Sequence, residues 1–203
     1  MTPEPEPDAT RVDVAGLQAR AEQVLATVPA WIWNGETLPV PVEEIADSCF
    51  SLLVRDVSPG EMSRLPGAPP LDPGQAVSGL LLASRGEIWV NADEAREWPG
   101  RRRFTICHEL GHWRLHRTGQ ESLFCRSTTV APEERDVQAA STNPPVPITE
   151  EEANAFAAAL LMPARLIRER YPQVRDHAAM CRLFGASGAA MGKRLHAVIE
   201  HSR

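Results

Sequence analysis

The sequence lacks the features that mark several large classes of protein. Its four cysteines (Cys49, Cys107, Cys125 and Cys181) lie far apart and form no C-x-x-C pair. This spacing argues against a zinc ribbon and a small disulfide scaffold, and favours reduced thiols. No apolar run approaches the roughly 18 residues of a membrane span, and the acidic start MTPEPEPDATR has no secretory character. We therefore expect a cytoplasmic protein with no membrane partner.

Positive charge is also scarce overall. The formal net charge is −6, which argues against a protein that coats nucleic acid or an anionic membrane. The charge is nevertheless uneven, because residues 1–50 carry nine acids and two arginines, whereas residues 163–203 carry eight basic side chains and three acids. The basic C-terminal part is suited to an acidic partner.

Length and composition predict one globular unit with loose ends. The chain has 203 residues, 43% of them hydrophobic, which is enough for one well-buried core. Residues 1–11, rich in proline and acid, are expected to form a disordered arm because they offer little to bury. We expect the main domain to span residues 12–170, and a helical tail to span residues 171–203.

The spacing of apolar residues predicts helices, then a short sheet, then helices again. AVSGLLLAS and EIWVNA, separated by Arg85-Gly86, predict an antiparallel hairpin. The other expected elements, in chain order, are a helix in VAGLQARAEQVLATV, a short helix at 39–49, a strand within 49–57, a loop at 58–75, a helix at 101–116, a strand in SLFCRSTTV, one long helix at 150–171, and short helices at 176–184 and 188–201. This order predicts an α+β fold with a small antiparallel sheet.

The stretch RRRFTICHELGHWRLH, residues 101–116, holds three of the six histidines. A helix advances about 100° per residue, so His108 and His112 stand on one face and can hold one ion. Glu109 is displaced around the helix, which suits a carboxylate that reaches a metal-bound water. This is the H-E-x-x-H arrangement of zinc proteases. The stretch therefore predicts Zn²⁺ on His108 and His112, with Glu109 as the catalytic carboxylate.

A catalytic zinc usually has three protein ligands, so one more is needed. His116 continues the four-residue stripe but lies too far along the same helix, which favours a supporting role behind the ligands. The carboxylates of TEEEANAFAAALLMP are better placed, because they belong to another helix. Glu150 shares a face with Asn154, so Glu150 is suited to ligate while Asn154 orients a metal-bound histidine.

Other carboxylates stay open as the third ligand. Glu151 is expected to point to solvent, and Glu152 to complete a T-x-x-E capping box with Thr149. Glu121, Glu133 and Glu134 lie in an expected loop and are less well placed.

Three segments carry a family resemblance. RRFTICHELGHWRLH, EEEANAFAAALLMP and FGASGAAMGKRL resemble motifs of the ImmA/IrrE family of bacterial metallo-endopeptidases. The resemblance implies a zincin-type core with zinc on His108, His112 and Glu150, and with Glu109 as the catalytic residue. It also implies a protein substrate, often a helix-turn-helix repressor. The chain departs from the family pattern at Cys107 and in the tail at Gly185-Ala186.

These observations predict a zinc-dependent endopeptidase in which Glu109 takes a proton from the attacking water. The alternative is a DNA-binding or partner-binding regulator whose zinc is structural or latent. Residues 182–195, with Ser187 as a cap, resemble a helix-turn-helix, so DNA contact, substrate docking and a plain scaffold all stay open. EIWVNA, if it is an edge strand, is suited to pair with an extended substrate.

Overall fold

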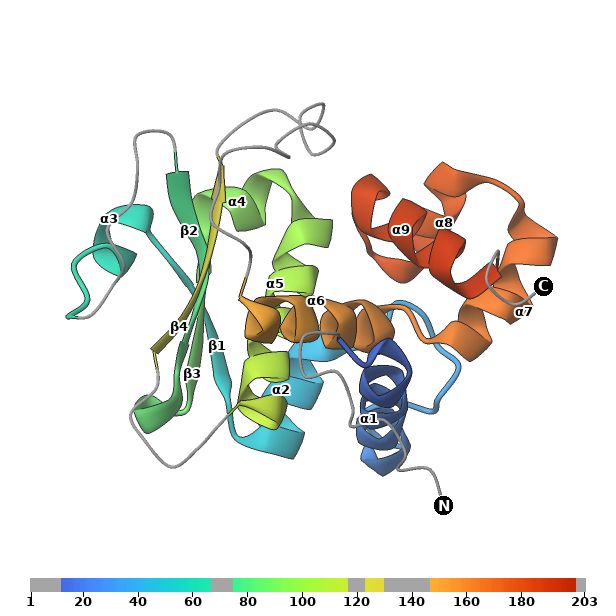
Figure 1. Ribbon diagram of the computed structural model, residues 1–203, viewed down its shortest axis with the longest axis horizontal. Coiled ribbons are helices and arrows are strands. Elements are labelled where there is room, and N and C mark those ends of the chain that lie inside the picture. Colours follow the sequence, from blue (N-terminus) through green and yellow to red (C-terminus); the bar gives the residue numbers. More distant parts are fainter. Residues whose placement is uncertain (1–11, 67–74, 117–122, 130–146, 200–203) are drawn as a thin grey trace, which may run out of the picture.

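The computed structural model describes residues 12–66, 75–116, 123–129 and 147–199. It has the expected α+β fold: a four-stranded sheet lies at one side, α5 (Pro99–Leu115) packs against it, and α6 (Ile148–Leu161) crosses α5 (Figure 1). The predicted disordered arm, residues 1–11, lies outside the described residues. None of the helices within the described residues has the length and apolar character of a membrane span.

The sheet is mixed, and its strand order is β1-β3-β2-β4. The hairpin of β2 (Gln75–Leu82) and β3 (Glu87–Asn91) is antiparallel as expected. The prediction of a purely antiparallel sheet is wrong, because β1 (Leu53–Val57) pairs with β3 in parallel. Pairing on both sides makes β3 an inner strand, so EIWVNA is not an edge strand. Its side chains from Ile88 onward are buried, as is usual where a parallel pair is covered on both faces.

The two faces of the sheet belong to different apolar clusters. Leu81, Ile88 and Val90 join the main core, whereas Leu80 and Trp89 face a second cluster with Met62 of the short helix α3 (Pro59–Met62). The alternation follows the two-residue period of a strand. A 3₁₀ turn at Ala83–Arg85 joins β2 to β3, and β4 (Leu123–Thr129) pairs with the outer side of β2.

Two N-terminal helices complete the main core. α1 (Val14–Thr27) starts at Asp13, whose carboxylate accepts from the Gly16 amide at 3.0 Å, and it packs on α6. α2 (Val42–Phe50) packs on α5. Arg102 of α5 ties these layers together, because it donates to Glu43 of α2 at 2.6 Å and to Asp56 of β1 at 2.9 Å.

The expected long helix at 150–171 is two helices. α6 ends at Leu161, and α7 (Ala164–Val174) begins after Pro163. Pro163 has no amide hydrogen to donate and disfavours helical geometry in the residue before it, so Met162 leaves the helical region, with φ −131° and ψ 75°. The chain therefore turns after α6.

Helices α7, α8 (His177–Phe184) and α9 (Gly188–Ile199) lie at the side of the molecule away from the sheet, whereas α4 (Ala92–Glu97) lies beside the sheet (Figure 1). α4 leads into α5, while α8 and α9 follow α7. Gly185, at φ 60°, makes the turn between α8 and α9. Apolar side chains of α8 and α9, such as Phe184 and Met191, belong to the same core as those of α5 and α6.

Candidate metal centre

α5 and α6 together build the candidate metal centre. His108, Glu109 and His112 are fully buried in α5, and Glu150 reaches them from the first turn of α6. The Nε2 atoms of His108 and His112 are 3.1 Å apart. The Glu150 carboxylate lies 3.2 Å from His108 Nε2 and 3.1 Å from His112 Nε2. Within the described residues, these three side chains form a group able to hold a metal ion.

The spacing of these atoms fits a small tetrahedral ion. Metal bonds of about 2.0 Å at tetrahedral angles separate neighbouring ligand atoms by about 3.3 Å. The observed separations of 3.1 and 3.2 Å are close to that edge length. Two imidazoles and one carboxylate are also the ligand set of a catalytic zinc that keeps one coordination position for water.

Hydrogen bonds to the Nδ1 atoms of His108 and His112 determine which nitrogen of each ring carries no proton. His108 Nδ1 donates to Asn154 Oδ1 at 3.0 Å. His116 Nε2 lies 2.9 Å from Glu152, and the Nδ1 atoms of His116 and His112 are 3.0 Å apart. A carboxylate only accepts, so with neutral rings His116 donates through Nε2 and His112 donates through Nδ1. Both ligand rings then turn a lone pair towards Glu150, an arrangement that fits a cation among the three groups.

Glu150 favours its ionised form. Burial acts to raise the pKa of this carboxyl group, but hydrogen bonding and charge from His108 and His112, in the form in which their Nε2 atoms carry protons, outweigh it and lower the pKa to about 2. A cation held between the rings would act in the same direction. The group therefore offers a carboxylate, the form that binds metal.

The three neighbouring glutamates of α6 have different surroundings. Glu150 meets the histidines, Glu151 is exposed, and Glu152 bonds to His116. The predicted capping box is wrong, because α6 begins after Pro147 with no side-chain hydrogen bond at its start. The bond to partly buried His116 therefore replaces the expected local one. The expected loop residues Glu121, Glu133 and Glu134 lie outside the described part of the chain.

Two glycines that the sequence analysis did not single out, Gly111 and Gly79, allow α6 and β2 to approach α5 closely. A Cβ atom on Gly111 would lie 3.1 Å from Ala153 Cα, so glycine there lets α6 approach α5. A Cβ atom on Gly79 of β2 would lie 2.7 Å from Glu109 Oε1 and would also collide with Thr105 Cγ2. Glycine is unfavourable inside helices and strands, so its presence at these points is the signal that could have revealed the contacts.

Cys107 takes no part in the group. Its side chain is fully buried in the main core, and this burial raises the pKa of the thiol to about 12. An apolar environment is the usual one for a cysteine that only fills space.

Comparison with known proteins agrees with this geometry. The chain resembles a solved structure described as a Mycobacterium tuberculosis transcriptional regulator, with a TM-score of 0.51 and 21% identity over 90% of this chain and 46% of that one. The chain thus spans about half the length of that regulator. Among curated proteins, no match is found. The model of the IrrE N-terminal-like domain, Peptidase_M78, matches residues 72–196, which is more than half of the chain and includes every residue of the metal centre. The chain therefore belongs to the ImmA/IrrE family of metallopeptidases.

Proposed function

We propose that the chain is a zinc-dependent endopeptidase in which His108, His112 and Glu150 hold the zinc and Glu109 is the general base. The observation that carries the proposal is the meeting of three metal-binding side chains on two helices next to a buried fourth carboxylate. A purely structural zinc site has no use for Glu109 beside an open coordination position. This carboxylate favours the enzyme over the regulator with a structural or latent zinc.

The supporting residues have distinct tasks in this proposal. Asn154 holds the His108 ring through Nδ1, while His116 and Glu152 hold the His112 ring. These bonds keep both Nε2 lone pairs directed at the ion and make the rings better ligands. When bound, zinc would supply the Lewis acidity that activates water and polarises a peptide carbonyl.

Glu109 carries the proton in the hydrolysis. Its carboxylate accepts a proton from the water that attacks the carbonyl carbon, and then donates that proton to the leaving amine nitrogen. The peptide bond is thereby replaced by a carboxylic acid, which then ionises, and an amine. The backbone of β2 passes close to this side chain at Gly79, which limits the positions that the carboxylate can adopt.

The substrate class follows from the family. We propose a protein substrate, specifically a helix-turn-helix repressor, cut by a zincin-type core of residues 12–170 in the cytoplasm. The tail, residues 171–203, is proposed to be helix-turn-helix-like, with Ser187 accepting from the Ala190 amide at 3.3 Å at the start of α9. DNA contact by this tail is the less favoured role, because its Arg194 is buried in the fold.

The test compares the wild type with Glu109→Gln against the helix-turn-helix repressor encoded nearest its own gene. Loss of the general base should lower kcat/KM by roughly 10²- to 10⁴-fold, whereas zinc content, measured by elemental analysis, should stay at the wild-type value. The exposed Glu151→Gln on α6 is the matched control and should leave both unchanged. Equal cleavage by wild type and Glu109→Gln, or loss of zinc from Glu109→Gln, would overturn the assignment.

A further inference from the structure

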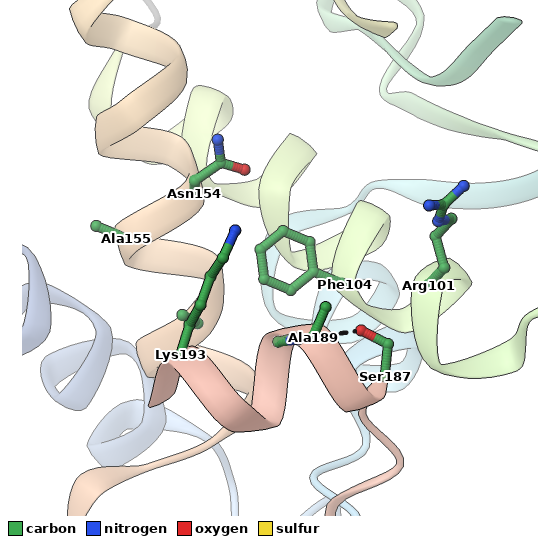
Figure 2. A pocket seen from close by; sticks show the side chains of 9 residues that line it. Arg101, Phe104, Asn154, Ala155, Ser187, Ala189 and Lys193 are labelled. Atoms are coloured by element: carbon green, nitrogen blue, oxygen red, sulfur yellow. Dashed lines mark hydrogen bonds between the residues drawn. The ribbon is translucent and has the colours of Figure 1, made fainter. Parts of the chain in front are cut away.

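A pocket of about 410 Å³ lies between α5, α6 and α9 (Figure 2). Four alanines leave its space open, and the ring of Phe104 forms an apolar wall. The residues that line it are Arg101, Phe104, Asn154, Ala155, Ala158, Ser187, Ala189, Ala190 and Lys193. A pocket with small apolar walls and a few polar groups is the usual form of a ligand site.

The charged side chains of the pocket are both cations. Arg101 projects from α5 and Lys193 from α9, with Phe104 between them, and none of the nine lining residues is acidic (Figure 2). Arg101 is oriented by a long ion pair with Glu94 at 3.9 Å and by the Trp98 ring, whose centroid lies 5.1 Å away. A guanidinium has five N–H donors, so these contacts leave donors for a ligand. Two cations beside an apolar wall favour a carboxylate on a short aliphatic stem.

The pocket adjoins the metal centre through one shared residue. Asn154 lines the pocket and accepts the hydrogen bond from His108. Along α6, Asn154 lies about 6 Å beyond Glu150 and Ala158 about 12 Å beyond it, at 1.5 Å per residue. An extended peptide advances about 3.3 Å per residue. In a substrate that runs along α6 with one peptide bond at the metal centre, a side chain two or three residues away would lie at this pocket.

We propose that this pocket is a specificity subsite that takes a glutamate or aspartate side chain of the protein substrate, two or three residues from the cleaved bond. Lys193 binds the carboxylate, Arg101 on the other side of Phe104 adds a second positive charge that favours it, and the alanines and Phe104 contact the aliphatic stem. The inference rests on the proposed peptidase function, since it fixes the occupant as a peptide side chain. Binding at the pocket itself is measurable without turnover.

The first experiment uses Lys193, which is the only lysine in the chain. Reductive methylation with ¹³C keeps its positive charge and gives one side-chain NMR signal at the pocket. The N-terminal amine gives a second signal, recognised by its lower pKa of about 8. Zinc-loaded Glu109→Gln protein is titrated with acetyl-Ala-Ala-Glu-Ala-Ala-amide and with the same peptide carrying glutamine.

The glutamate peptide should shift the Lys193 signal saturably and bind about fivefold more tightly than the glutamine peptide, the upper range for one exposed ion pair. Arg101→Gln should weaken the glutamate peptide by a similar factor, while Arg182→Gln, an exposed cation of α8 outside the pocket, should not. Equal binding of both peptides, or no shift with either, would overturn the proposal. So would free glutarate that binds as tightly as the glutamate peptide, because the pocket would then take a small dicarboxylate.

A second experiment profiles cleavage of a proteome-derived peptide library. The wild type should favour an acidic residue at a fixed position two or three residues from the cut, Lys193→Glu should lose that preference or replace it by a basic one, and Arg182→Glu should keep it. Cleavage without any acidic preference would sink the subsite and leave the peptidase standing. Selective glutamate binding in the NMR titration without any cleavage would leave the pocket as a binding site for acidic peptide side chains and overturn the peptidase, and with it the role as a specificity subsite.

Discussion

The metal centre and the C-terminal helices use their polar side chains in opposite ways. At the metal centre, ring nitrogens and carboxylates of α5 and α6 converge on one point, with ligand atoms 3.1–3.2 Å apart. In the C-terminal helices, the basic side chains go to separate partners. Arg165 pairs with Glu169, Arg194 donates to the Met162 carbonyl, and Lys193 lines the pocket. The spacing of ligand side chains along each helix therefore predicts a shared site, whereas the number of basic residues in a segment does not predict a shared binding surface.

Removing the third ligand is the strongest test of the metal centre, where the polar side chains converge. Glu150→Ala leaves two imidazoles, so we expect zinc affinity to fall by more than about 100-fold, beyond the range for loss of an outer partner, and cleavage to disappear with the metal. Competition with a chelator of known affinity measures the change. Glu151→Ala, one residue away and exposed, is the control. Unchanged affinity in Glu150→Ala would assign the third ligand to another carboxylate.

Glu152→Gln changes the metal centre indirectly, through the hydrogen bond of Glu152 to His116. The amide has no negative charge to hold the His116 proton, so His112 loses its fixed orientation. We expect zinc affinity to fall by about 10- to 100-fold, as for other outer partners of metal-bound histidines. Circular dichroism of the metal-free protein should match the wild type, and Glu151→Gln should bind zinc normally. A wild-type affinity in Glu152→Gln would reduce the pair of His116 and Glu152 to a packing contact.

Local rules account for what the sequence could predict. The four-residue spacings of His108 with His112, and of Glu150 with Asn154, follow from helix geometry alone. The hairpin of β2 and β3 likewise follows from two adjacent strands and a turn. The break at Pro163 also has a local cause, since proline disfavours a continuing helix, although the sequence analysis expected one unbroken helix there. The roles of the metal-centre residues stay predictions until metal and activity are measured.

Contacts between distant segments account for what the sequence could not predict. The parallel pairing of β1 with β3 depends on where the hairpin docks, which no local pattern encodes. The close approaches at Gly79 and Gly111 depend on how near β2 and α6 come to α5. Glu152 had a plausible local partner in Thr149, but partly buried His116 is its partner in the folded chain.

Replacing Arg194 tests the C-terminal helices, where the basic side chains have separate partners, and we expect it to have the smallest effect of the three substitutions. Its side chain is buried, donates to the Met162 carbonyl at 2.9 Å and lies 3.3 Å from Gln18 Oε1. Burial lowers its pKa to about 10, which still leaves it charged at neutral pH.

Arg194→Met keeps similar bulk but leaves the carbonyl unsatisfied, so we expect the free energy of unfolding to fall by about 1–3 kcal/mol. Lys193→Met, on the exposed side of the same helix, should change it by less than about 0.5 kcal/mol. Urea denaturation measures both. A more stable Arg194→Met protein would show that the free-energy cost of burying this charge exceeds the contribution of its hydrogen bonds. The expected loss of stability would show that Arg194 holds α9 against α1 and the junction of α6 and α7. A residue with that role is not part of a surface that binds an acidic partner.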